Sequence, residues 1–181
     1  MIVLGIDPGS HRCGYGVVAR EGTRLRTVES GVIEPGDLPL AERLSIILCG
    51  LEEVIARTRP AEAAVEQVHT GPSPRSALVL GQARGVALAA AARGGLSVFE
   101  YQPSEVKLSF TGSGRASKEQ MIRTARQLLG IDANLSDEAD ALAIAVCHLA
   151  RRIARIATDP KRAAATLSRL RPARREHRSC P

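Results

Sequence analysis

The stretch Met1-Ile-Val-Leu-Gly-Ile-Asp7-Pro-Gly9 opens the chain with an apolar, β-branched run that stops at a carboxylate and a Pro-Gly turn. A run of this length bounded by turn residues predicts a buried central strand with Asp7 at the edge of the sheet. Two further extended patterns follow, over residues 14–19 and 24–33. Because turn residues separate the three segments, they predict an antiparallel meander.

Helical and extended patterns alternate over the rest of the chain. Apolar residues at three- and four-residue steps predict a helix over residues 38–57. An Ala- and Gly-rich segment predicts another over 73–93, and capping serines predict helices over 117–130 and from Asp137 into the region of Arg151. Short apolar runs predict strands over residues 61–68 and 96–101, followed by a short segment over 103–108 and a flexible loop over 111–116. This order predicts an α/β fold with a mixed five-stranded sheet flanked by helices. The same order resembles that of the ribonuclease H-like architecture.

The charge is unevenly distributed along the 181 residues. The net charge of +6 combines a net of +8 after position 150, from ten basic and two acidic residues, with a net of −2 before it. We expect residues 1–155 to form one folded domain and residues 156–181 to form a disordered basic tail. Within the domain, basic residues concentrate between positions 70 and 126, which suits a polyanion such as a nucleic acid.

The cysteines and the hydropathy pattern predict the redox state of the thiols and the cellular location of the protein. Cys13, Cys49, Cys147 and Cys180 are widely spaced, without a C-x-x-C pair, so we expect reduced thiols rather than a disulfide framework or structural zinc. No apolar run is long enough to span a membrane, and no secretory leader pattern opens the chain. These patterns predict a cytoplasmic protein.

Carboxylates recur at the boundaries of the predicted elements. Glu66 interrupts an apolar strand near its end, where an unpaired charge is costly. Asp137 and Asp140 lie three residues apart in the first turn of a predicted helix, so both project from one face. Acids are common at helix starts, and this pair alone is weak evidence for a site. Together with Asp7, however, the acids predict a cluster at one edge of the sheet.

Such a cluster needs a cation. Two carboxylates 4 Å apart repel by about 4 kcal/mol at an effective dielectric constant of 20. A donor set of oxygen atoms alone, without His or Cys, favours Mg²⁺ or Mn²⁺ over zinc. Sites of this kind hydrolyse phosphodiesters with two ions about 3.5 to 4 Å apart. We therefore expect Mg²⁺ as cofactor, with Mn²⁺ able to substitute, and two ions per site.

The motifs resemble those of the RuvC Holliday-junction resolvase family. The resemblance covers residues 1–155 in order and spacing, and rests on Gly5-Ile-Asp7-Pro-Gly9 with Gly14-Tyr-Gly16, Val65-Glu66-Gln67, Ser76-Ala-Leu-Val-Leu-Gly-Gln82-Ala-Arg84-Gly85 and Asp137-Glu-Ala-Asp140-Ala-Leu-Ala143. It implies a structure-specific endonuclease that makes paired, symmetric cuts in four-way DNA junctions during recombination and repair. It also implies a homodimer that works with the RuvA–RuvB branch-migration complex.

The resemblance assigns roles residue by residue. It implies that the four acids Asp7, Glu66, Asp137 and Asp140 bind the metal ions and that Lys107 and Lys118 lie near the scissile phosphate. Lys118 also opens a predicted helix beside a Gly-rich loop, which is a favourable place for a phosphate. The alternative for either lysine is a solvated surface charge.

Further DNA contacts are predicted around these acids. They comprise His69, Arg75, Arg84, Lys107, Arg115 and Lys118. His69 stands where many members of the family carry a base-stacking phenylalanine, and histidine stacks less well, so it is either a stacking residue or a plain loop residue. His148 lies eleven residues after Asp137, about 16 Å along a helix, too far to bind the same ion. We expect His148 to pack or cap.

The dimer interface is predicted on the helix over residues 73–93. Small residues such as Gly81 and Gly85 make this helix thin and allow close approach of a partner. A four-way junction has approximate two-fold symmetry, and its resolution needs two matched cuts, so a C₂ dimer with two sites suits the reaction.

Three other functions remain open from the sequence. A ribonuclease H-like nuclease acting on RNA or RNA–DNA hybrids would use the same fold and acids. The segment Asp7-Pro8-Gly9 also resembles the first phosphate loop of the actin and sugar-kinase superfamily, although that superfamily needs a duplicated domain and a second phosphate loop. A junction-binding protein without catalysis is disfavoured because all four acids are present.

Overall fold

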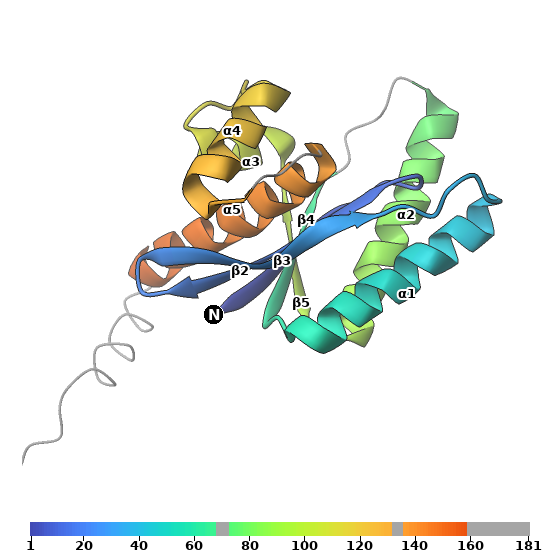
Figure 1. Cartoon of the computed structure of the whole chain (residues 1–181), viewed down its shortest axis with the longest axis horizontal. Helices are drawn as coiled ribbons and strands as arrows, with labels where there is room; N and C mark the ends of the chain where they lie inside the picture. The colour runs from blue at the N-terminus through green and yellow to red at the C-terminus, as the bar shows by residue number, and fades with distance from the viewer. Residues whose placement is uncertain (68–72, 132–135, 159–181) are drawn as a thin grey trace, which may run out of the picture. The chain divides into compact units, whose positions relative to one another are not determined.

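The fold is a five-stranded mixed sheet with helices on both faces (Figure 1). The computed structural model describes residues 1–67, 73–131 and 136–158, and side chains up to residue 154. The strands lie in the order β3-β2-β1-β4-β5. Their bounds are β1 Ile2–Asp7, β2 Cys13–Glu21, β3 Arg24–Ile33, β4 Glu62–Glu66 and β5 Ser97–Tyr101. The first three strands pair antiparallel, and β1, β4 and β5 run parallel, so the predicted mixed sheet is confirmed.

In the described part of the chain, five helices connect or follow the strands. Their bounds are α1 Leu40–Thr58, α2 Pro74–Arg93, α3 Pro103–Thr111, α4 Lys118–Leu129 and α5 Ser136–Thr158. The helix α3 is longer than the short segment predicted at residues 103–108. A capping box between Gln102 and Glu105 begins α3, and Gly112 ends it at φ 80°, in the left-handed region that favours glycine.

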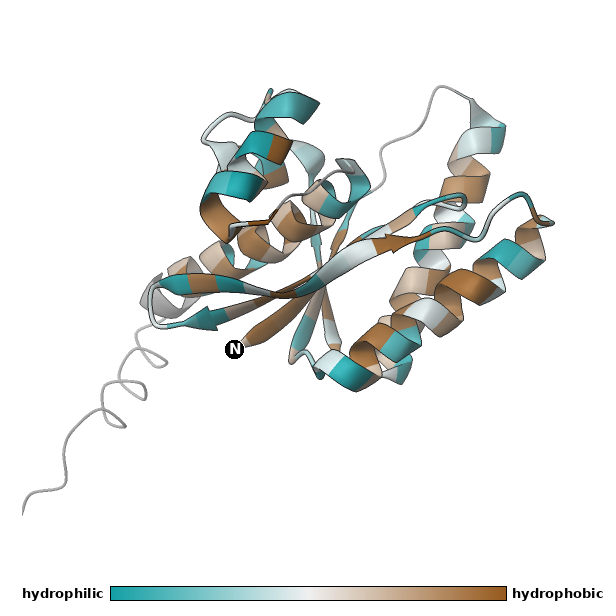
Figure 2. Ribbon diagram, viewed as in Figure 1, coloured by the Kyte–Doolittle hydropathy of each residue, from teal (hydrophilic) through white to brown (hydrophobic). Residues whose placement is uncertain are grey.

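Alternate residues of β1 pack against different helical layers. Leu4 and Ile6 lie in a buried cluster with Ile47 and Leu51 of α1. Val3 lies instead in a cluster with residues of α3, α4 and α5. The helices α1 and α2 therefore cover one face of the sheet, and α3, α4 and α5 cover the other (Figure 1). Figure 2 shows apolar residues along the central strands, between the two layers.

The contacts divide the chain into residues 1–149 and 150–181, and α5 continues through position 158. Nearly all of the predicted tail, residues 156–181, lies outside the described residues. Among the described residues, no helix combines the length and the apolar character needed to cross a membrane.

Candidate active site

Asp7 and Glu66 end two neighbouring parallel strands. The last paired residues of β1 and β4 are Ile6 and Val65, so the two acids follow side by side at the carboxyl edge of the sheet. Asp7 shares its face of β1 with Val3 and Gly5, which contact the α5 layer, since side chains alternate along a strand. Burial of the apolar residues of β1 therefore fixes the position of Asp7 in the site.

Three glycines allow α5 to lie unusually close to the sheet. A Cβ atom on Gly5 would lie 2.1 Å from the carbonyl oxygen of Ala141, and one on Gly16 would lie 2.8 Å from the backbone nitrogen of Leu142. A Cβ on Gly14 would lie 2.1 Å from the carbonyl oxygen of Asp137. A side chain at any of these positions would push the helix away. The glycines therefore bring the first turns of α5 toward Asp7.

The predicted acids influence one another electrostatically. Burial raises the pKa of Asp7 from 3.8 to about 7, and repulsion by Glu66, Asp140 and Asp137 adds to this rise. Burial, and then repulsion by Asp140, raises the pKa of Glu66 from 4.5 to about 7. The pKa of Asp140 is also raised, chiefly by burial and then by Asp137. The fold thus holds the acids together against their repulsion, an arrangement typical of functional sites.

Two lysines lie on the same side of the sheet as the acids. Lys107 of α3 lowers the pKa values of Glu66 and Asp140, opposing their rise. Lys118, the first residue of α4, does the same for Asp7 and Asp140. Two ammonium groups, one of them at the N-terminus of α4, therefore interact with the carboxylates, and such positive charge would also stabilise a phosphate.

Arg12 is a site residue that the sequence analysis missed. It lies in the loop between β1 and β2, and its Nε donates a hydrogen bond to Oδ2 of Asp137 at 2.7 Å. Its Nη2 lies 3.3 Å from Oε1 of Glu34, just after β3. Arg12 is the only Arg or Lys between Asp7 and Gly14, and this nearness to Asp7 was the one sequence feature that could have indicated a contact with the acids.

The carboxylates are not gathered around a single point. Within the described ranges, no three His, Cys, Asp or Glu side chains are arranged to hold one metal ion. The donor set nevertheless fits a hard divalent cation, because all four predicted ligands are carboxylates. One of these carboxylates, that of Asp137, is engaged by a guanidinium.

The other predicted DNA-binding residues are spread over different parts of the chain. Arg115 is exposed in the turn before α4, and Arg75 is exposed in the first turn of α2. Arg84 forms an ion pair of 2.6 Å with Glu100 of β5 and is not brought to the acids. His69 lies outside the described residues.

His148 packs in the core, as expected. Its side chain is 1% exposed, with Nδ1 at 2.8 Å from the hydroxyl of Tyr101 and Nε2 at 2.6 Å from Oε2 of Glu62. The ring also packs against Phe99. These contacts join α5 to β4 and β5.

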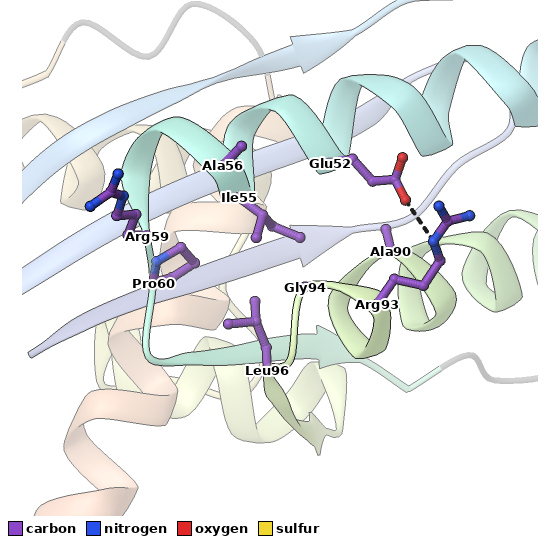
Figure 3. A pocket seen from close by; sticks show the side chains of 9 residues that line it. All are labelled: Glu52, Ile55, Ala56, Arg59, Pro60, Ala90, Arg93, Gly94 and Leu96. Atoms are coloured by element: carbon purple, nitrogen blue, oxygen red, sulfur yellow. Dashed lines mark ion pairs between the residues drawn. The ribbon is translucent and has the colours of Figure 1, made fainter.

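A separate pocket of about 500 Å³ lies where α1 and α2 end, near the beginning of β4 and so at the edge opposite Glu66 (Figure 3). Ile55 and Leu96 give it apolar walls, and Arg93 forms an ion pair of 3.0 Å with Glu52 at its rim. The predicted acids do not contribute to this pocket, so it is not the candidate active site.

Known proteins are similar to this chain in sequence and in fold. A family model described as crossover junction endodeoxyribonuclease RuvC matches residues 3–148. A crossover junction endodeoxyribonuclease RuvC from Anaeromyxobacter dehalogenans (strain 2CP-C) is 72% identical, with 100% of both chains covered. A protein of the same name from Bordetella avium is 50% identical over 82% of this chain and 83% of its own.

Solved structures agree with these relatives. T. thermophilus RuvC in complex with a Holliday junction substrate is 37% identical, with a TM-score of 0.78 over 87% of this chain and 97% of that chain. The yeast mitochondrial Holliday junction resolvase, at 14% identity, has a TM-score of 0.66 over 91% of this chain and 83% of its own, and shows the shared fold alone. With the family model covering most of the sequence, the chain belongs to the crossover junction endodeoxyribonuclease RuvC family.

Proposed function

We propose that this member of the RuvC family is a structure-specific endonuclease that resolves four-way DNA junctions by paired, symmetric hydrolysis of phosphodiester bonds. The observation that carries the proposal is the partly buried, mutually repelling group of Asp7, Glu66 and Asp140 beside two lysines. Such a group is costly for stability, which suggests a role in binding cations rather than in the fold. Relatives with the name crossover junction endodeoxyribonuclease support the substrate.

The carboxylates Asp7, Glu66, Asp137 and Asp140 would hold Mg²⁺, with Mn²⁺ as a substitute, and two ions per site. When bound, the ions supply an activated water and stabilise the leaving oxygen. Oxygen ligands without His or Cys support this choice of metal. The rigid strand β1 fixes the position of Asp7, and the close packing of α5 on Gly5 fixes that of Asp140.

The lysines and nearby basic residues would hold the DNA backbone. Lys107 and Lys118 interact with the acids, so they would supply positive charge to a phosphate held at the cluster. Arg115 and Arg75 are exposed and free to contact phosphates away from the cut. Phosphate contacts of this kind make binding weaken steeply with salt.

The protein would act as a homodimer through α2. Leu78 is 64% exposed, and a Cβ atom on Gly81 or Gly85 would meet nothing within 4 Å. These residues recur on one side of α2, opposite the buried Ala83, Ala87 and Ala90. A thin apolar face of this kind suits a second copy of the helix, and two copies supply the two sites that paired cuts need. We also propose that the protein cooperates with a RuvA–RuvB branch-migration complex, a proposal that membership in the RuvC family supports.

A comparison of substrates tests the proposed activity. The full chain is incubated with Mg²⁺ and, in parallel, with labelled four-way junction, linear duplex and RNA–DNA hybrid. We expect symmetric nicks in opposing strands of the junction and little cutting of the other two. Equal cutting of the hybrid would favour a ribonuclease instead and would contradict the assignment.

A further inference from the structure

Arg12 holds one of the proposed metal ligands through a direct charge-assisted hydrogen bond. The 2.7 Å contact from its Nε to Oδ2 of Asp137 joins the β1–β2 loop to the start of α5. Nη2 of the same guanidinium also lies 3.3 Å from Oε1 of Glu34. Arg12 therefore bridges two carboxylates, that of Asp137 at the start of α5 and that of Glu34 just after β3, through charge-assisted contacts.

The start of α5 is itself well anchored, so Asp137 meets Arg12 because of the backbone position. The hydroxyl of Ser30 donates a hydrogen bond of 2.6 Å to Glu138, the next residue. The backbone of Asp137 also lies against Gly14. With the helix held in place, the carboxylate of Asp137 can bind either the Arg12 guanidinium or a cation at the cluster of acids.

A carboxylate that neutralises a guanidinium is a poorer ligand for a second cation. Asp137 interacts with Asp7 and Asp140, so it lies near enough to belong to their cluster, yet its Oδ2 is taken by Arg12. The Arg12 charge also lowers the attraction of the whole cluster for a divalent ion. Both effects of Arg12, the hydrogen bond to Asp137 and the added positive charge, lower the affinity of the site for a divalent cation.

We propose that Arg12 is a positioning residue that competes with divalent cations for Asp137 and so sets the metal concentration at which this ligand joins the site. The inference rests on the proposed function, because it takes the four acids as the metal ligands. Its consequence has a definite sign: removal of Arg12 strengthens metal binding. A purely structural role for the Arg12–Asp137 contact would have the opposite effect, since its loss would loosen α5 and weaken the site.

The test is binding of Mn²⁺ alone to the full chain without DNA, by calorimetry and by the electron paramagnetic resonance signal of free Mn²⁺. We expect Arg12→Ala to bind Mn²⁺ roughly 3- to 10-fold more tightly than wild type, as the loss of a partly exposed ion pair allows. Arg12→Lys keeps the charge and should return the affinity toward the wild-type value. An affinity of Arg12→Ala that is unchanged or weaker would overturn the inference.

Arg20→Ala is the matched control. It removes the same charge from β2, where Arg20 donates a hydrogen bond of 2.7 Å to the carbonyl oxygen of Gly22, far along the strand from Asp137. Equal tightening by this variant would show a general effect of net charge and would overturn the role of Arg12. A wild-type chain that binds no Mn²⁺ would overturn the proposed metal site as well, whereas normal wild-type binding with an unaltered Arg12→Ala would overturn this inference alone.

Discussion

Gly14 and Asp137 lie so close that a Cβ atom at position 14 would be 2.1 Å from the carbonyl oxygen of residue 137. This contact joins β2 to the start of α5, 123 positions later in the sequence. The absence of a side chain on one strand therefore controls where a carboxylate on a distant helix lies. The chemistry of the site depends on this packing as much as on the acids themselves.

Replacement of Gly14 by alanine should separate α5 from the sheet. We expect the free energy of unfolding to fall by about 1 to 3 kcal/mol, because the clash is with backbone and cannot be relieved by a rotamer change. Junction cleavage should fall by about 100-fold, as expected for ligands displaced by an ångström. Urea denaturation and single-turnover cleavage measure the two effects. Thr23→Ala, in the exposed turn after β2, is the control and should change neither.

Asp7→Asn should stabilise the fold in a pH-dependent way when metal is removed with a chelator. Burial raises the pKa of Asp7 from 3.8 to about 7, so between these values the unfolded chain loses a proton that the folded chain keeps. Wild-type stability from this group is therefore lost as pH rises from 4 to 7. The variant escapes this loss and should exceed wild type by on the order of 2 kcal/mol at pH 8, with little difference at pH 4.

The measurement is the difference in free energy of unfolding between the two proteins across this pH range. Glu66→Gln should behave similarly, because burial also raises the pKa of Glu66 to about 7. A difference that does not vary with pH would show that neither carboxylate is destabilised by its surroundings.

His148→Ala should destabilise the core. The change opens a cavity in the α5 layer and removes hydrogen-bond partners from Glu62 and Tyr101, with an expected loss of about 2 to 5 kcal/mol. Thermal unfolding followed by circular dichroism provides the comparison. His11→Ala, at an exposed loop position, should leave the midpoint nearly unchanged. Equal midpoints for both variants would mean that the contacts of His148 contribute little.

Leu78→Arg should dissociate the proposed dimer. A guanidinium at this exposed apolar position of α2 would bring like charges together across a two-fold axis. Light scattering should give two chain masses for wild type and one for the variant at equal concentration. Leu108→Arg, on an exposed position of α3, should remain a dimer. Dissociation by the Leu108 change instead would place the interface on α3.

Much of the fold and part of the site follow from the sequence for a physical reason. Apolar runs and helical periodicity predicted the mixed sheet because burial imposes those patterns on strands and helices. The proximity of Asp7 and Glu66 followed because adjacent parallel strands end at the same edge. The family assignment, which rests on the motif order, is confirmed by the matching family model.

Contacts between distant loops could not be predicted in this way. Arg12 reaches Asp137 only because three glycines set the height of α5 above the sheet, and no local pattern encodes that distance. The predicted start of α3 at residue 103 is correct, but the helix continues beyond residue 108 to Thr111, because the stop signal is Gly112 in the left-handed region. The His148 contacts join positions 86 and 47 residues apart, so only the folded chain reveals them.

The most direct test of the central claim is cleavage of a labelled four-way junction in Mg²⁺ by wild type and Asp7→Asn, with junction binding measured on the same preparations. Loss of one carboxylate charge should abolish cutting while binding stays within about twofold, because Lys107, Lys118 and the other basic residues are unchanged. Paired nicks from wild type and none from the bound variant are the result that we predict. Undiminished cutting by Asp7→Asn would contradict the assignment of this acid to the catalytic site.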